Sequence, residues 1–284
     1  MNWITSIARL LRLLPSSMRG KQRLARWLLN WHPCISGPLC ILTRHGHRIH
    51  LPNAQEPIAF SLLISGDYEP EVLALLWHRL QPGDTALDIG ANVGVFTLPL
   101  ATRVGPSGKV IAVEASPPVF QYLDRNVREN QLTNVLPLHA AAADQPGEVS
   151  FFEAPAHSFG MSGLGNLAGS TTHRVSARTV DEIVSAAGCE RVAAMKVDVE
   201  GFEVLVFKGA RGLIERRELN FIVFEFLDWA EERVPGGKPG DAQRYLRDSG
   251  FQLWRLEDYD RGRPPLNHIL ETGGGCLWPS GGER

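Results

Sequence analysis

The sequence predicts an α/β fold built on a mostly parallel sheet, because short apolar runs alternate with amphipathic helical segments. The first observation is the apolar run 85–89, which meets a glycine-rich turn and then a segment at 93–101 with helical character. The second is a repeat of this strand–helix alternation along the chain, which indicates roughly seven strands in total. The third is a series of acidic residues at or near the ends of these runs.

The turn after the first run suits a nucleotide-like ligand. Gly90 and Gly94 lack a Cβ atom, so a ligand can approach the backbone, and N–H groups at the helix start are expected to face it. The dinucleotide pattern Gly-x-Gly-x-x-Gly is not present, because Asn92 stands where the second glycine would allow contact with a pyrophosphate. NAD is therefore disfavoured as the cofactor.

Two acidic residues indicate a different cofactor. Asp88, near the end of the run 85–89, would repel a phosphate but would suit a ligand that carries an amino group and a sulfonium. Glu114 closes the next apolar run, 110–113, where a carboxylate can accept hydrogen bonds from both ribose hydroxyls. Together these features favour S-adenosylmethionine over NAD, with a tight turn that binds nothing as the alternative.

Composition limits the class of protein. The 284 residues are 44% hydrophobic, which is enough for one large domain or for one domain with appendages. A net charge of −2 gives no electrostatic reason to expect a nucleic-acid partner. The cysteines show no metal-binding spacing, so a disulfide framework and a metal site are both disfavoured, and a reducing, cytoplasmic setting is favoured; they are Cys34, Cys40, Cys189 and Cys276.

Residues 1–31 are basic and contain no acidic residue. Apolar residues recur at helical spacing before Pro15, which predicts a basic amphipathic helix; they are Ile4, Ile7, Leu10, Leu11 and Leu14. Such a helix can make peripheral contact with an anionic membrane, or it can pack on its own domain, which is the favoured interpretation. Neither a signal peptide nor a membrane span is expected.

The histidine-rich segment that follows favours a hairpin over a metal site. His45, His47 and His50 are separated by Gly46 and Arg48, a pattern typical of an exposed turn between two short strands.

A run of small residues follows the strand predicted at 134–140. Ala141 and its neighbours leave space for a flat ring, and Asp144 is a candidate for binding an exocyclic amine, with a simple loop acid as the alternative. Two further strands are expected at 147–153 and 174–179, joined by a long Gly-Ser-rich segment that suits a lid or a binding loop.

Charged residues gather in a second informative segment, 195–203. Strand alternation would put Lys196, Asp198 and Glu200 on one pleat face, and Glu225 lies near the end of the next apolar run. Charges in a buried parallel strand are costly unless they are paired or functional. These residues are therefore candidates for the reactive centre, and a Lys–Asp pair that only ties two strands together is the alternative.

These segments resemble a known family. The sequences at 88–94 and 196–203, with Glu114, Val180-Asp181-Glu182 and Glu225, resemble the FkbM family of S-adenosylmethionine-dependent methyltransferases over residues 66–256. The resemblance implies a class I methyltransferase (Rossmann-like) fold with helices on both faces of a sheet ordered 3-2-1-4-5-7-6, its last strand antiparallel. It also implies methyl transfer, most often to a hydroxyl oxygen. Val180 stands where the family usually has a leucine, and this difference changes only the volume of a core side chain.

The resemblance and the residue pattern assign roles to individual side chains. One group is expected to bind the cofactor: Asp88, Gly90, Asn92 and Gly94 at the methionine end, Glu114 at the ribose, Ala141 and Asp144 at the adenine, and Glu69 in the family's lead-in sequence. A second group is expected to face the acceptor: Lys196, Asp198, Glu200 and Glu225. Asp198 or Glu200 is the candidate base, Lys196 would steady its charge, and no metal is expected.

The expected domain organisation has three parts: an N-terminal helical and short-strand extension over 1–65, a methyltransferase domain over 66–272 and a flexible tail over 273–284. The acceptor is expected to be a hydroxyl of a sugar, a polyketide or another small molecule or glycan. Two alternatives stay open: an N-methyltransferase, although no Asn/Asp-Pro-Pro-Tyr loop is present, and an inactive cofactor-binding interaction protein.

Overall fold

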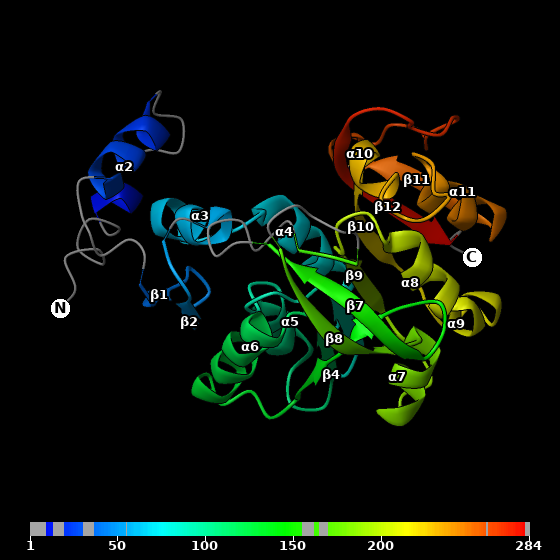
Figure 1. The fold of residues 1–284 in the computed structure, drawn as a ribbon, viewed down its shortest axis with the longest axis horizontal. Helices are drawn as coiled ribbons and strands as arrows, with labels where there is room; N and C mark the ends of the chain where they lie inside the picture. The colour runs from blue at the N-terminus through cyan, green and yellow to red at the C-terminus, as the bar shows by residue number, and fades with distance from the viewer. Residues whose placement is uncertain are drawn as a thin grey trace.

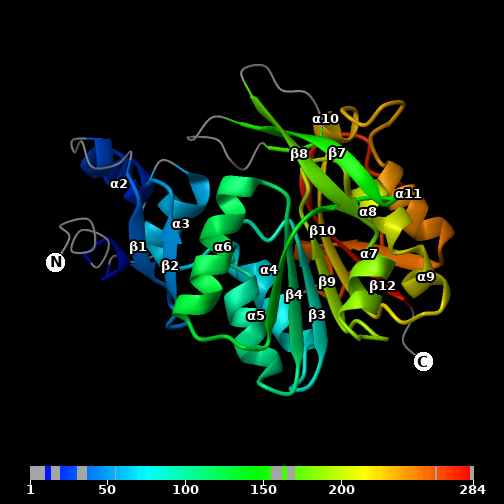
Figure 2. The same cartoon turned by 60° about the horizontal axis from the view of Figure 1, so that its bottom comes forward.

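A seven-stranded sheet forms the centre of the molecule (Figures 1 and 2). The computed structural model describes residues 10–13, 20–30, 37–54, 56–154, 162–164, 170–259 and 261–281. The strands lie in the order β11 (Phe251–Arg255), β12 (Gly274–Gly281), β10 (Ile222–Leu227), β9 (Ala194–Val197), β3 (Thr85–Ile89), β4 (Lys109–Glu114) and β5 (Val135–His139). β12 is antiparallel to both of its neighbours, whereas the other neighbouring pairs are parallel. The expected class I order is therefore confirmed.

Helices cover both faces of this sheet. One face carries α4 (Pro70–Arg79), α5 (Thr97–Val104) and α6 (Pro117–Glu129); the other carries α7 (Val180–Ala186), α8 (Glu203–Gly209), α9 (Arg211–Glu215) and α11 (Asp241–Asp248). Successive strand residues point to opposite faces, so Ala86 and Val110 pack towards α4 and α5, and Leu87 and Ile111 pack towards α7 and α8. Both faces of each central strand are thus buried, as a parallel sheet requires.

Two helix starts follow the sequence closely. Ser116 caps α6, where its side chain accepts a hydrogen bond from the Val119 N–H, and Pro117 occupies the first helical position. Thr179 and Glu182 form the expected capping box at the start of α7.

A small second sheet lies over the carboxyl ends of the central strands (Figure 2). It contains β6 (Ala141–Ala142), β8 (Thr171–Arg178) and β7 (Gly147–Glu153), in that order. Ala141, Phe151 and Val175 form its own apolar cluster. The two strands predicted on either side of the Gly-Ser-rich segment are therefore confirmed.

The N-terminal elements pack at the edge of the domain near α6 (Figure 1). They are α2 (Lys21–Asn30), the hairpin of β1 (Leu39–Leu42) and β2 (Arg48–Leu51), and α3 (Pro57–Ser65). Asn126 of α6 accepts a hydrogen bond from the His50 N–H and donates one to the His50 carbonyl. The predicted hairpin is confirmed, but its histidines are not all exposed, because His47 is buried against Thr102.

The amphipathic helix predicted near the N-terminus is described only in part. Leu11 and Ala25 are buried with Ile64 of α3, and the Arg12 guanidinium donates to the carbonyl oxygens of Leu42 and Leu62. Ile4, Ile7 and Leu14 lie outside the described residues. Among the described helices, none has the length and apolarity that crossing a membrane requires.

Two elements differ from the predictions. The helix expected from residue 93 begins at Thr97. Asn92 and Gly94 have positive φ angles, which a right-handed helix does not contain, so the turn extends past Gly94. The C-terminal residues expected to be loose form β12, which lies between β10 and β11 and pairs with both through its backbone. The sequence of these residues has too little apolar pattern to predict a strand. The strand is held in place by main-chain hydrogen bonds with its two neighbours.

Candidate functional site

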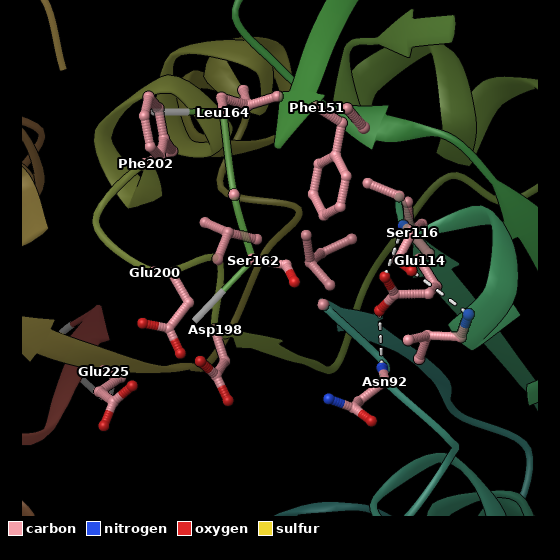
Figure 3. Close-up of a pocket in the computed structure, with 18 of the residues that line it drawn as sticks. Asn92, Glu114, Ser116, Phe151, Ser162, Leu164, Asp198, Glu200, Phe202 and Glu225 are labelled. Carbon is pink, nitrogen blue, oxygen red and sulfur yellow. Dashed lines mark hydrogen bonds between the residues drawn. The ribbon is translucent and has the colours of Figure 1, made fainter. Parts of the chain in front are cut away.

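A cavity of about 410 Å³ opens at the carboxyl ends of β3, β4, β9 and β10, beneath the small second sheet (Figure 3). In an open α/β sheet this edge is where ligands bind. The N-terminal extension also contributes to the wall, through Glu56, Pro57 and Ile58. These residues precede the segment that resembles the family, so their place in the cavity could not be predicted from that resemblance.

Glu114 lies at one end of this cavity and is held by the backbone. Its two carboxylate oxygens accept hydrogen bonds from the N–H groups of Asn92 and Ser116, at 2.9 and 2.8 Å. Burial raises the pKa of Glu114 to about 7, and these hydrogen bonds oppose the rise. Each oxygen can accept a further hydrogen bond, so the side chain can still bind a hydroxyl group.

An apolar slot adjoins Glu114. Val113, Val119, Ala141 and Phe151 line it, and Phe151 reaches in from the small sheet (Figure 3). Small apolar side chains beside an aromatic ring suit a planar heterocycle.

The glycine turn, residues 90–94, differs from the expectation in one respect. Three of its N–H groups already have hydrogen-bond partners within the protein. Those of Gly90 and Ala91 donate to the Val113 carbonyl, and that of Asn92 donates to Glu114. Gly90 lines the cavity, but its missing Cβ is explained by the turn that follows β9, because an added Cβ would lie 1.8 Å from the Asp198 carbonyl oxygen. The turn therefore joins two strand ends as well as facing the cavity.

A buried ion pair lies behind this turn. Asp88 and Lys196 are register partners on β3 and β9, and both side chains point to the face of the sheet that α5 covers. Thr97 donates a hydrogen bond to Asp88 at 2.5 Å, and the Lys196 ammonium lies 5.0 Å from the Phe96 ring centroid. Neither residue lines the cavity. The structure therefore places Asp88, expected at the ligand, and Lys196, expected at the acceptor, as a buried pair behind the cavity wall.

Lys196 still connects the turn to the end of the cavity that Asp198 lines. Its ammonium donates to Asp198 at 3.1 Å and to the Gly90 carbonyl at 3.3 Å, and lies 3.8 Å from Asp88. Burial lowers the pKa of Lys196, but Asp198 and Asp88 more than offset this and raise it above its ordinary value. Lys196 is thus a permanent positive charge between two carboxylates, and Asp88 and Asp198 lie at the same rim of the sheet.

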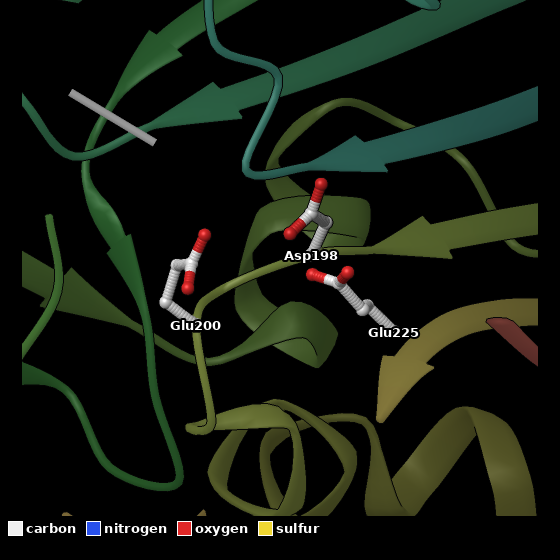
Figure 4. Close-up of side chains that lie close together, drawn as sticks. All are labelled: Asp198, Glu200 and Glu225. Carbon is white, nitrogen blue, oxygen red and sulfur yellow. The ribbon is translucent and has the colours of Figure 1, made fainter. Parts of the chain in front are cut away.

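Three carboxylates face the cavity at its other end (Figure 4). Asp198 and Glu200 follow β9, which ends at Val197, so they belong to a turn and not to the pleated strand that was expected. Glu225 comes from β10, and oxygens of all three residues lie within 4.8 Å of one another. Such a group has the dimensions to hold a divalent cation, although no metal was expected from the sequence.

Crowding changes the acidity of this group. Burial, followed by the charges of Asp198 and Glu225, raises the pKa of Glu200 to about 9. Burial and the Asp198 charge also raise the pKa of Glu225 to about 8. At neutral pH both carboxyl groups therefore tend to hold a proton, which reduces their mutual repulsion.

Glu203 fixes the turn that carries these acids, a role that the sequence analysis missed. Its side chain is buried, and one oxygen accepts hydrogen bonds from the Val199 and Gly201 N–H groups, both at 3.2 Å. Between them Glu200 has a φ of 55°, in the left-handed region that a non-glycine residue rarely adopts. An acid in the first turn of α8 is a signal that could have identified this anchor.

The remaining candidates occupy different places. Gly94 lies behind the cavity against Leu123, and Asp144 is exposed and outside the cavity, so it is not positioned to contact an adenine there. Glu69 lies in a neighbouring cavity, and burial followed by the Asp198 charge raises its pKa.

These residues fit S-adenosylmethionine. Glu114 offers carboxylate oxygens for a ribose, the slot beside Ala141 and Phe151 suits an adenine, and Asn92 and Gly90 line the path towards the three carboxylates. The cavity has the size of a small-molecule site, and the Asp198 carboxylate at its far end suits a sulfonium.

Comparison with known proteins gives the same assignment. Residues 88–253 match the family model described as the Methyltransferase FkbM domain. The hexuronic acid methyltransferase AglP of Haloferax volcanii is 27% identical over 208 residues, which cover 69% of this chain and 77% of that protein. The AMB antimetabolite synthetase AmbE of Pseudomonas aeruginosa is 26% identical over 216 residues, 63% of this chain but 10% of that protein.

Among solved structures, an FkbM methyltransferase from Methylobacillus flagellatus aligns with a TM-score of 0.45 and 15% identity, over 78% of this chain and 52% of that one. The family model spans more than half of the sequence. The chain therefore belongs to the FkbM family of S-adenosylmethionine-dependent methyltransferases.

Proposed function

We propose that this methyltransferase acts on a hydroxyl oxygen of a sugar or a related small polyhydroxyl acceptor. The observation that carries the proposal is that Asp198, Glu200 and Glu225 line the same cavity as Glu114, so that donor and acceptor can meet in one space. A hydroxyl acceptor must lose a proton during transfer, and carboxylates are suitable bases. The relative named hexuronic acid methyltransferase supports a sugar as the acceptor class.

Bound S-adenosylmethionine supplies a methyl group that its positive sulfur has already activated. The protein then has to hold the two reactants in line and to remove the acceptor proton. In this proposal Glu114 holds the ribose, Asn92 and Gly90 hold the amino-acid end, and Ala141 with Phe151 encloses the adenine. Asp88 and Gly94 act from behind the turn and do not touch the cofactor.

Glu200 is the proposed base. Its side chain lines the cavity from a turn whose left-handed backbone is held by Glu203, and strain of this kind is common at functional positions. Its raised pKa makes its carboxylate a better proton acceptor than an ordinary glutamate. Asp198, the other candidate from the sequence, is already engaged by Lys196 and is proposed to fix the local charge and to orient the acceptor.

Transfer of a labelled methyl group tests the proposal. Purified protein is incubated with labelled S-adenosylmethionine and two panels of acceptors, one of methyl glycosides and one of primary and secondary amines. We expect label in the glycoside panel only. Label in the amines would support N-methylation instead, and no label from a protein that binds S-adenosylhomocysteine would support an inactive cofactor-binding protein.

A further inference from the structure

We propose that a second cavity, next to the reactive carboxylates, binds a second, uncharged sugar unit of the acceptor. This cavity has a volume of about 430 Å³ and lies between the start of α4, the start of α12 (Leu256–Tyr259) and the first residues of β12. The proposal rests on the proposed function and narrows it: the acceptor is an oligosaccharide or a glycoside of at least two units, not a single sugar.

The two cavities share a wall. Tyr68 lines the first cavity, and the next residue, Glu69, lines the second. Glu225 lines the first cavity, and its register partner on β12, Cys276, lines the second. Paired residues on antiparallel strands point to the same face of a sheet, so Cys276 lies directly beside Glu225. No residue lines both cavities, so a chain of two sugar units would cross this boundary with one unit at the carboxylates and the next in the second cavity.

A glycine run keeps the second cavity open. A Cβ added at Gly273, just before β12, or at Gly275 within it would have no other atom within 4 Å, so at these positions the chain presents bare backbone to the cavity. Gly274, between them, is packed against Leu227, where an added Cβ would lie 2.7 Å from a side-chain carbon. The strand is thus closely packed on one side and open on the other, and its φ angles at 273 and 275 disfavour larger residues.

The lining suits a neutral sugar ring. Leu256 is half-buried and offers apolar surface to the C–H face of a ring, and charged residues at the rim can hydrogen-bond its hydroxyl groups. At this rim Glu71 and Glu257 are acidic and Arg255 is basic, and Glu69 adds a further acid. Acidic side chains outnumber basic ones here, so a unit that carries a carboxylate is disfavoured.

Arg255 is the most informative side chain for a test. It is exposed, lies at the end of β11 and forms no ion pair with any described residue, so its replacement leaves the fold intact. Arg247, near the end of α11, is also exposed and lies outside both cavities. Arg247→Ala is therefore a matched control for Arg255→Ala.

The kinetic test uses methyl glycosides of glucose, galactose, mannose and N-acetylglucosamine, each as the monosaccharide and as the 1,4-linked disaccharide. For the glycoside that is methylated, we expect the disaccharide KM to be about tenfold lower than the monosaccharide KM. Arg255→Ala should raise the disaccharide KM about tenfold more than the monosaccharide KM, and Arg247→Ala should change neither. Equal KM values for the two lengths, or an equal effect of Arg255→Ala on both, would overturn the second subsite.

Binding without turnover gives an independent readout. The protein with S-adenosylhomocysteine is titrated with each monosaccharide and each disaccharide in a calorimeter. We expect the disaccharide Kd to be about tenfold lower than the monosaccharide Kd, and Arg255→Ala should remove this difference. If no glycoside is methylated, the proposed function fails, whereas equal Kd values for the two lengths would remove the subsite.

Discussion

Replacing Glu200 tests the proposed proton transfer, and its pH dependence can be worked out from the site. Burial and the charges of Asp198 and Glu225 raise the pKa of Glu200 to about 9. A carboxyl group with this pKa is ionised in about 1% of molecules at pH 7 and in about half at pH 9. Because only the ionised form accepts a proton, kcat/KM for the hydroxyl acceptor should rise about fiftyfold between these pH values and then level off.

The assay is the initial rate of labelled methyl transfer between pH 6.5 and pH 10, with the acceptor below its KM. Glu200→Gln keeps the size of the side chain and cannot accept the proton, so kcat/KM at pH 9 should fall about 10²–10⁴-fold and lose the rising limb. Glu190→Gln, at an exposed position away from the cavity, should keep both the rate and the limb.

Two results would refute this reasoning. A wild-type profile that is flat between pH 7 and pH 9 would show that no group with a raised pKa has to lose its proton before transfer. A Glu200→Gln variant that keeps the limb and most of its rate would assign the base to another residue.

Four further predictions address the rest of the site. Asp198→Asn should lower kcat about 100-fold or more while the Kd for S-adenosylhomocysteine stays within threefold, as measured by radiometric turnover and calorimetry. Glu114→Ala should raise that Kd at least about tenfold, because a ribose contact and the support of the Asn92 N–H are both lost. Lys196→Met should lower the free energy of unfolding by about 3–5 kcal/mol in urea titrations, because Asp88 is fully buried beside it. Incubation with EDTA should leave kcat within twofold, because protons held by Glu200 and Glu225 already balance the acidic cluster; loss of activity that Mg²⁺ restores would contradict this.

Much of the fold could be predicted because its signals are local. The run 85–89 and the acid at 114 mark strand ends directly, and the family resemblance supplied the order of the strands. The C-terminal strand was missed because residues 273–275 are glycines without an apolar pattern. Its formation depends on hydrogen bonds from β10 and β11, which are distant in sequence.

The sequence indicated which residues gather at the candidate site, but not which of their side chains are buried. Glu114 and Glu225 were placed correctly at the cavity, because each lies at or near the end of its strand. Lys196 was assigned to the acceptor by strand alternation, but β9 ends one residue later, and Asp198 and Glu200 continue as a turn. The residue at which β9 ends therefore determines that Lys196 is buried in a pair with Asp88, while Asp198 and Glu200 reach the cavity.

A crystal structure with bound S-adenosylhomocysteine and a methylatable glycoside tests the central claim most directly. We predict that Glu114 accepts hydrogen bonds from the ribose hydroxyls, and that the sulfur faces the acceptor hydroxyl beside Glu200. A cofactor bound elsewhere, or an acceptor hydroxyl on the far side of the sulfur from Asp198, Glu200 and Glu225, would contradict the account.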